Sequence, residues 1–252
     1  MRTIHCHNLY HLGDCIQTLH FLIHASRLND VAFNFFCNPT YHSQLKEFIG
    51  NEKINLITVP NQTEPSFDTW IGAHRYDKIS ERSIELYKEN SDQATYFLVL
   101  WNIVSELMKI KCPFKEKKDM VYDEETINQK CSHDGKYDVL FINSRNMSIP
   151  FPNFENEVSE MISKLEKSQK TFILTDRRDG YPCTIDYGLS ALQIARLSKT
   201  VKKIIAVNTG PLHLCMNKWT IEKVDEFIVW SPAETFNHGP KFKCVKLLKE
   251  IS

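Results

Sequence analysis

The sequence predicts an α/β protein made of two halves, each built on a parallel sheet, with a ligand cleft between them. Three observations predict this class. Short apolar runs rich in β-branched and aromatic residues alternate with segments of helical periodicity. The alternation stops over a long polar stretch and then resumes. The length of 252 residues leaves room for two small domains. Strands that alternate with helices favour parallel sheets with crossover helices.

The first 60 residues are expected to alternate between strand and helix. Apolar residues at Ile16, Leu19 and Leu22 recur at helical spacing, whereas Pro39 and Pro60 each follow an apolar run and end it. The expected elements are an extended start at Thr3–His7, a helix at Asp14–Arg27, a strand at Val31–Cys37, a helix at Tyr41–Ile49 and a strand at Ile54–Val59.

The middle of the chain separates the two halves. Residues 61–93 are polar, with a short helix expected at Ser80–Lys88, and Ala94–Ile110 is an apolar helical segment. The following stretch, Cys112–Lys136, is charged and has a turn expected at Lys115–Asp119. We therefore expect domains at 1–125 and 126–252.

In the second half the alternation of strand and helix resumes. The helix expected at 154–167 places Val158, Ile162 and Leu165 on one face. The expected elements are strands at Tyr137–Ile142, Thr171–Thr175, Lys203–Val207 and Glu226–Trp230, and helices at Phe154–Lys167, Gly188–Ser198, from Pro211 to Met216 and at Cys244–Ile251.

Composition excludes several classes of protein. The 31 Lys and Arg balance 31 Asp and Glu, so the chain lacks the basic excess of a general nucleic-acid binder. The eight Cys form no Cys-x-x-Cys pair and several lie in apolar runs, which favours free thiols in a reducing compartment. The N-terminus does not resemble a signal peptide, and the apolar run 94–110 is short and contains charges. A cytoplasmic protein is expected.

The first candidate site is Leu12-Gly13-Asp14-Cys15-Ile16-Gln17-Thr18, between the first strand and the first helix. Gly13 offers the backbone freedom for a tight turn. Asp14 has two interpretations: an N-cap paired with Gln17 in a capping box, or a carboxylate that acts as a general base on an acceptor hydroxyl. The two roles compete for the same oxygens.

The second candidate site is Asn208-Thr209-Gly210-Pro211-Leu212-His213, which follows the strand expected at 203–207. A strand, a small polar turn and a helix start can bind a phosphate through backbone N–H groups and the helix dipole. Thr209 could cap the helix or donate to a phosphate oxygen, and Pro211 suits a first helical turn. An ordinary connection between strand and helix fits the same pattern.

These two motifs together resemble the ADP-heptose:lipopolysaccharide heptosyltransferase family. That family has Gly-Asp followed by Thr near the N-terminus and Asp-(Ser/Thr)-Gly-x-x-His-Leu-Ala near the C-terminus, similar here to Gly13-Asp14 with Thr18 and to Asn208–Leu214. Residues 188–195 are also similar to the segment that precedes the family's second motif. The resemblance implies the GT-B fold, with two Rossmann-like domains: an acceptor domain at 1–125 and a nucleotide-sugar domain at 126–252.

The resemblance also implies roles for individual residues. Asp14 would be the base, and Thr209 and Gly210 would bind the donor diphosphate, with Pro211 and Leu212 in the same helix start. His213 is either a donor contact or a packed structural residue. Asp176 or Asp179 would bind the nucleotide ribose, unless their loop is only a solvated charged one.

The chain departs from the family pattern at two places. Asn208 stands where the family has Asp, and no Lys precedes Pro150, where the family has its phosphate-binding Lys. Arg145 is a suitable replacement for that Lys, because a guanidinium binds phosphate well.

A long polar loop of the first half is expected to face the acceptor. It carries Trp70, His74 and Arg75, and Gly13 would lie on the same side. A Trp there can stack on a sugar ring or pin the loop. Five His lie in the first 24 residues, but no Cys or carboxylate completes a zinc set in the sequence, so no metal is expected.

The expected function is metal-independent, inverting glycosyl transfer. A nucleotide-diphosphate sugar is the co-substrate and no other cofactor is expected; the acceptor is a glycan or a lipopolysaccharide-like glycolipid, with peripheral contact to a membrane and no nucleic-acid partner. Two alternatives remain open: a nucleotide-sugar epimerase of the same fold, and a non-catalytic nucleotide-sugar-binding or scaffold protein. The sequence does not indicate the oligomeric state.

Overall fold

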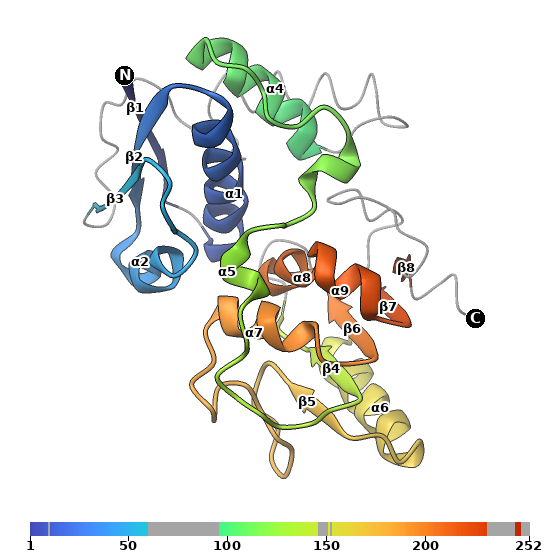
Figure 1. The fold of residues 1–252 in the computed structure, drawn as a ribbon. Coiled ribbons are helices and arrows are strands. Elements are labelled where there is room, and N and C mark those ends of the chain that lie inside the picture. The colour runs from blue at the N-terminus through green and yellow to red at the C-terminus, as the bar shows by residue number, and fades with distance from the viewer. Residues whose placement is uncertain (10, 60–95, 146–150, 152, 231–244, 248–252) are drawn as a thin grey trace. The chain divides into compact units, whose positions relative to one another are not determined.

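The computed structural model describes residues 1–9, 11–59, 96–145, 151, 153–230 and 245–247 (Figure 1). These residues form two compact units, one ending at Val121 and the other beginning at Tyr122. The division falls near the junction expected at 125/126. Both units are α/β, and every paired strand in them runs parallel to its neighbour, as the alternation in the sequence predicts.

The first unit contains a sheet in the order β1-β2-β3, formed by Arg2–Asn8, Val31–Cys37 and Ile54–Thr58. The central strand β2 alternates between buried and half-buried side chains, because successive residues point to opposite faces of a sheet. Phe33 and Phe35 are fully buried on one of these faces. This sheet therefore has one face packed into a core.

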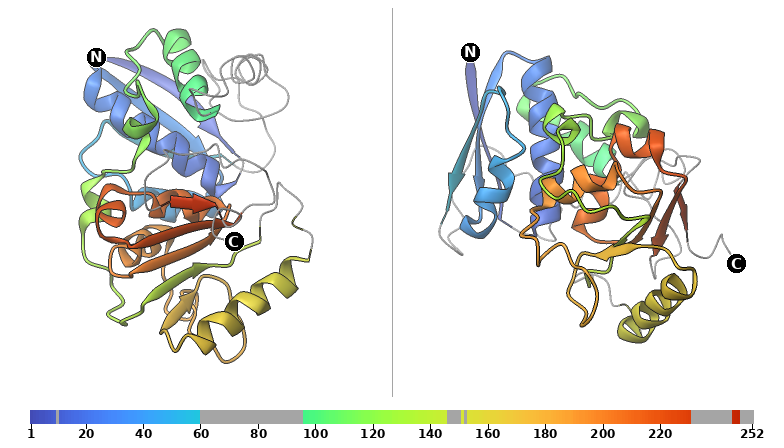
Figure 2. Two further views of the ribbon diagram at one scale, coloured as in Figure 1. Left: turned by 90° about the vertical axis from the view of Figure 1, so that its right-hand side faces the viewer. Right: turned by 60° about the horizontal axis from the view of Figure 1, so that its bottom comes forward.

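Helices α1 (Leu12–Leu28), α2 (Pro39–Lys46) and α4 (Tyr96–Met108) accompany this sheet, followed by the 3₁₀ helix η1 (Lys117–Met120) where a turn is expected. Figure 2 shows α1 running alongside the sheet. The ring of Phe21 on α1 stacks on Trp101 of α4, with centroids 4.7 Å apart, and both side chains are buried. This aromatic pair fastens α4 to α1.

The second unit contains a sheet in the order β5-β4-β6-β7-β8. Its strands are Val139–Ile142 (β4), Phe172–Leu174 (β5), Lys203–Val207 (β6), Glu226–Trp230 (β7) and Val245–Leu247 (β8). Every residue of β4 is buried, as expected for a parallel strand covered on both faces.

Helices cover both faces of this second sheet (Figures 1 and 2). Helix α6 (Phe154–Lys167) packs through Val158 and Ile162 on one face, and α7 (Ala191–Ser198) and α8 (Gly210–Cys215) pack on the other. Two short helices were not expected from the sequence, α5 (Glu125–Asn128) and α9 (Lys218–Lys223). None of the helices in the described ranges is long and apolar enough to cross a membrane.

Two expectations about this unit are wrong. Residues 245–247 form an edge strand parallel to β7, where a terminal helix was expected at 244–251, because the open edge of β7 supplies hydrogen-bond partners for an extended backbone. Helix α7 begins three residues later than expected. Gly188 has a φ of +62°, outside the helical region, and the Ser190 hydroxyl caps the helix by accepting from the Gln193 N–H.

Candidate functional site

Asp14 lies in the first turn of α1, but it is not the N-cap. The cap position is His11, whose backbone is extended, so Leu12, Gly13 and Asp14 are the first three helical residues. The capping box expected for Asp14 and Gln17 is therefore wrong, and so is the tight turn expected at Gly13. The helix starts earlier because an acidic residue is also favoured inside a first turn, where the helix dipole is positive.

Burial raises the pKa of the Asp14 carboxyl above its ordinary value of 3.8, and nearby His11 opposes part of this rise. A raised pKa makes the ionised carboxylate a stronger base than a solvated aspartate. The local environment of Asp14 thus suits a group that accepts a proton.

A buried polar link joins the end of β1 to the first turn of α1. The Asn8 amide donates to the Thr18 hydroxyl (3.0 Å), which in turn donates to the backbone carbonyl of Asp14 (2.8 Å). The Cys15 thiol donates to the Asn8 carbonyl (3.3 Å). Thr18, which belongs to the first motif, thus acts on the backbone that carries Asp14, a role that the sequence did not reveal.

In the second unit, polar residues follow the carboxyl ends of β5, β4 and β6, which lie along the same end of the sheet. The strand registers pair Phe141 with Leu174 and Ile142 with Ala206. Continued by two residues, the registers bring Asn143 level with Asp176, and Ser144 level with Asn208. Ligands of parallel α/β sheets bind outside the carboxyl ends of their strands, so this end of the sheet is the candidate donor site.

Asn143 links two of these strand ends, and sequence reasoning missed it. Its side-chain oxygen accepts from the backbone N–H groups of Thr175 (3.0 Å) and Asp176 (2.8 Å). Beside it, the Ser144 hydroxyl donates to the Asp176 carboxylate (2.9 Å). The available signal was an Asn directly after a fully apolar strand, but its partners lie about thirty residues away in the sequence.

The other expected residues of the loops after β4 and β5 are solvent-exposed. Arg145 is exposed directly after Ser144. Asp179 is exposed in a tight turn whose next residue, Gly180, has a φ of +86°. Such a φ favours glycine, so Gly180 accounts for the turn at this position. Of the two acidic candidates, Asp176 contacts the polar residues at the strand ends, through its hydrogen bond with the Ser144 hydroxyl.

The second motif forms the end of β6 and the start of α8. Thr209 is the N-cap residue, but its hydroxyl donates back to the Val207 carbonyl (3.2 Å) and does not cap the helix. Pro211 lies in the first turn, as expected, and Leu212 is buried in the core. Asn208 is buried, with its N–H donating to the Trp230 carbonyl (3.1 Å), and His213 is half-buried.

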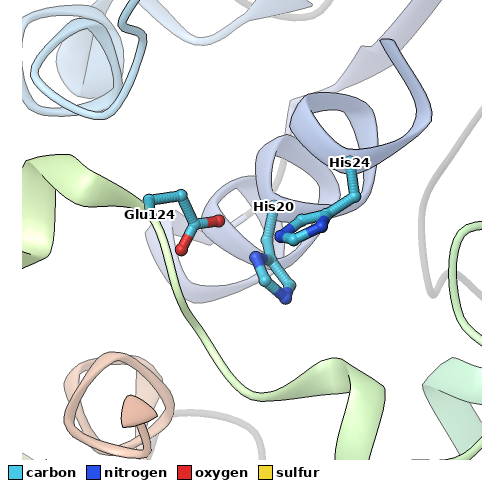
Figure 3. A group of neighbouring side chains, drawn as sticks. All are labelled: His20, His24 and Glu124. Atoms are coloured by element: carbon cyan, nitrogen blue, oxygen red, sulfur yellow. The ribbon is translucent and has the colours of Figure 1, made fainter. Parts of the chain in front are cut away.

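The residues expected to contact the acceptor and the clustered histidines belong to the first half of the chain. Trp70, His74 and Arg75 and the helix expected at 80–88 lie outside the described residues. His20 and His24 do share one face of α1, with ring centroids 4.7 Å apart (Figure 3). Figure 3 also labels Glu124, which belongs to the second unit and not to α1.

A groove of about 480 Å³ lies beside α6 in the second unit and does not coincide with the candidate site. Residues of α6, β6 and β7 line it, among them Met161, Ile205 and Trp230, but none of the residues expected to bind the donor does. We place the candidate site at the carboxyl ends of the strands because polar and charged side chains gather there.

No protein-family model and no curated protein sequence matches this chain. Solved structures do. The E. coli heptosyltransferase WaaC with ADP-2-deoxy-2-fluoro heptose is 13% identical, with a TM-score of 0.57 over 98% of this chain and 92% of that one. A glycosyl transferase family 9 structure from Veillonella parvula is 13% identical, with a TM-score of 0.55 over 98% and 85%. The iron-containing glycosyltransferase TibC of enterotoxigenic E. coli is 12% identical, with a TM-score of 0.58 over 97% and 62%.

This chain therefore has the fold of the heptosyltransferases, as the two motifs implied. At identities this low the likeness concerns the fold, and function has to be argued from the site.

Proposed function

We propose that this protein is a glycosyltransferase that moves a sugar from a nucleotide-diphosphate sugar to a hydroxyl acceptor. The observation that carries the proposal is the set of polar residues at the carboxyl ends of β4, β5 and β6, in a chain with the fold of structures solved with ADP-sugar ligands. The proposal includes the GT-B arrangement, with the second unit as the donor domain and the first as the acceptor domain.

The donor would bind through its ribose and its diphosphate. Asp176, with its carboxylate oriented by Ser144, would accept hydrogen bonds from ribose hydroxyls, and Asp179 is the exposed alternative. Arg145 and the backbone around Thr209 and Gly210 would face the diphosphate. Because α8 has only six residues, its dipole alone is a weak anion site, and the charge of Arg145 carries most of this role. Asn208 would bind the transferred sugar through its neutral amide.

The transfer step would be a single displacement. The Asp14 carboxylate takes the proton of the acceptor hydroxyl while that oxygen attacks the anomeric carbon. The bond between the anomeric carbon and the diphosphate oxygen breaks, and the nucleoside diphosphate leaves with the electron pair. Attack from the face opposite the leaving group inverts the anomeric configuration.

The decisive experiment is a thermal-shift screen of the full chain with nucleoside diphosphates and nucleotide sugars. A ligand at about 100 times its Kd should stabilise the protein by about 2.7 kcal/mol, which is a clear rise in Tm. We expect one nucleotide to give this rise and the matching nucleoside monophosphate to give a smaller one. No rise with ADP, GDP, UDP or CMP and their sugars would contradict the proposal.

We further propose that transfer needs no metal ion. The chain has no Asp-x-Asp pair to hold one, and Arg145 and the Thr209–Gly210 backbone would stabilise the leaving diphosphate. Dialysis against a strong chelator should therefore leave the transfer rate unchanged. Loss of activity that a divalent cation restores would contradict metal independence but not the transfer itself.

A second candidate function is non-catalytic binding of a nucleotide sugar. It is favoured by Asn208, a neutral amide where the resembling family has a carboxylate. Saturable binding of the nucleotide sugar without turnover, over a broad panel of acceptors, would favour this function. We also propose that the acceptor is a glycan or a glycolipid. The protein would act in the cytoplasm, with peripheral contact to a membrane.

A further inference from the structure

We propose that Asn143 is a positioning residue, which holds Asp176 in the geometry that recognises the ribose of the donor. This inference rests on the proposed function and extends it to a residue that does not touch the donor. Asn143 is only 1% exposed, directly after β4, so any effect on a ligand has to pass through its neighbours.

The Asn143 side chain holds the peptide groups on both sides of Asp176. Its oxygen accepts from the Asp176 N–H (2.8 Å) and the Thr175 N–H (3.0 Å), and its amide nitrogen donates to the Asp176 carbonyl (3.1 Å). The last backbone bond between the two strands runs from the Thr175 N–H to the Phe141 carbonyl (3.1 Å), so the peptide groups of Asp176 lie just beyond the sheet ladder. A carboxamide offers an acceptor and a donor on one planar group, which is the combination that these contacts need.

The residue after Asn143 completes the arrangement. The Ser144 hydroxyl donates to one oxygen of the Asp176 carboxylate (2.9 Å) and lies 3.1 Å from the Thr175 hydroxyl. Asn143 thus fixes the backbone of Asp176, and Ser144 fixes the orientation of its carboxylate. Asp176 is half-buried, so part of it remains open to solvent.

A carboxylate held in this way suits a pair of neighbouring hydroxyl groups. Ionised carboxylates accept strong hydrogen bonds, and a preorganised acceptor loses little entropy when a ligand arrives. The proposed consequence is discrimination: the site should prefer a ribonucleotide to the matching 2′-deoxyribonucleotide, and Asn143 should be needed for this preference although it is buried.

The test is a double-mutant cycle on nucleotide affinity. The Kd values of ADP, or of the nucleoside diphosphate that stabilises wild type, and of its 2′-deoxy form are measured by calorimetry for wild type, Asn143→Asp, Asp176→Asn and the double variant. Asn143→Asp keeps the acceptor oxygen but loses the donor to the Asp176 carbonyl once ionised. At pH 8 we expect Asn143→Asp to lower the affinity for the ribonucleotide about tenfold and to change the affinity for the deoxyribonucleotide little. In the Asp176→Asn background, adding Asn143→Asp should lower the ribonucleotide affinity by less than a further twofold.

The same variant gives a readout that general destabilisation would not produce. At lower pH the introduced carboxyl protonates and can again donate to the Asp176 carbonyl, so the ribonucleotide affinity relative to wild type should return. Asn128→Asp is the matched control, since Asn128 lies in the same unit and its contact with Glu125 is exposed. The control should change neither affinity.

Each result decides a separate point. If wild type binds no nucleotide, the proposed function falls, and this inference falls with it. If wild type binds equally to both nucleotides, or if Asn143→Asp weakens both equally in either background, the inference alone is overturned. If Asn143→Asp does not fold, Asn143→Ser takes its place in the cycle, and a loss of affinity that persists undiminished beside Asp176→Asn overturns the inference.

Discussion

Replacing Asp14 by Asn should lower the transfer rate by about 10²- to 10⁴-fold, the usual contribution of a general base, while the nucleotide still binds. The substitution removes the proton acceptor and keeps the size of the side chain. Asp14 lies in the first unit and the proposed nucleotide site in the second, so the donor Kd should stay within about twofold of wild type. The rate with saturating donor and acceptor is the quantity to measure.

The pH dependence of the wild-type reaction gives an independent check on the base. Because burial raises the pKa of Asp14, the acid limb of kcat/KM should lie above the ordinary value of 3.8 and should be absent from Asp14→Asn. Asp30→Asn is the control, since Asp30 is an exposed carboxylate of the same unit that pairs with Lys53. A normal rate in Asp14→Asn would remove the base from the proposed mechanism.

The stability of Asp14→Asn shows whether a lost rate reflects unfolding. A carboxyl with a raised pKa in the folded state favours folding when protonated and opposes it when ionised. The free energy of unfolding of Asp14→Asn should therefore match or exceed that of wild type at neutral pH. The difference should shrink as the pH falls through the raised pKa toward 3.8.

Trp101→Ala should lower the free energy of unfolding by about 3–5 kcal/mol, a large part of the roughly 5–15 kcal/mol that stabilises a typical domain. Trp101 is 1% exposed, stacks on Phe21 and lies against Phe97. Its removal leaves a cavity between α1 and α4 that rigid neighbours cannot fill. Urea unfolding followed by far-UV circular dichroism measures the change.

Trp219→Ala is the matched control for this substitution. Trp219 is half-buried on α9, with the Lys218 amine 4.6 Å and the Lys199 amine 5.8 Å from its ring. Such contacts contribute about 0.5–1 kcal/mol at exposed sites, so this variant should remain close to wild type. If Trp101→Ala costs no more than Trp219→Ala, the aromatic pair does not anchor α4 as inferred.

Patterns confined to a few neighbouring residues predicted most of the second unit. The fully apolar run Val139–Ile142 and the apolar face of Phe154–Lys167 could be interpreted without any distant partner, since burial on both faces of a strand or on one face of a helix is written in the local order of residues. The polar residues after each strand followed from the same reasoning. The turn that begins at Asn208 was expected on this ground, whereas the resemblance to the heptosyltransferase family implied the role of Asp176 or Asp179.

Local reasoning failed where a distant part of the chain decides. The sequence predicted a helix over residues 244–251, but the open edge of β7 makes residues 245–247 a strand. Asp14 and Gln17 have the spacing of a capping box, but α1 starts at Leu12 and its first turn is linked to β1 through Asn8 and Thr18. The first outcome depends on backbone partners in another strand, and the second depends on how the chain turns from β1 into α1, which residue spacing within the helix does not show.

The sequence by itself determined the alternation of strands and helices, the parallel sheets and the residue types that follow each strand. The tertiary structure alone decided that Asn143 bonds to Thr175 and Asp176 and that burial raises the pKa of Asp14. The physical reason is the range of the forces concerned. Helical and strand periodicity arises between close neighbours in the chain, whereas burial and side-chain hydrogen bonds depend on which distant segments the fold brings together.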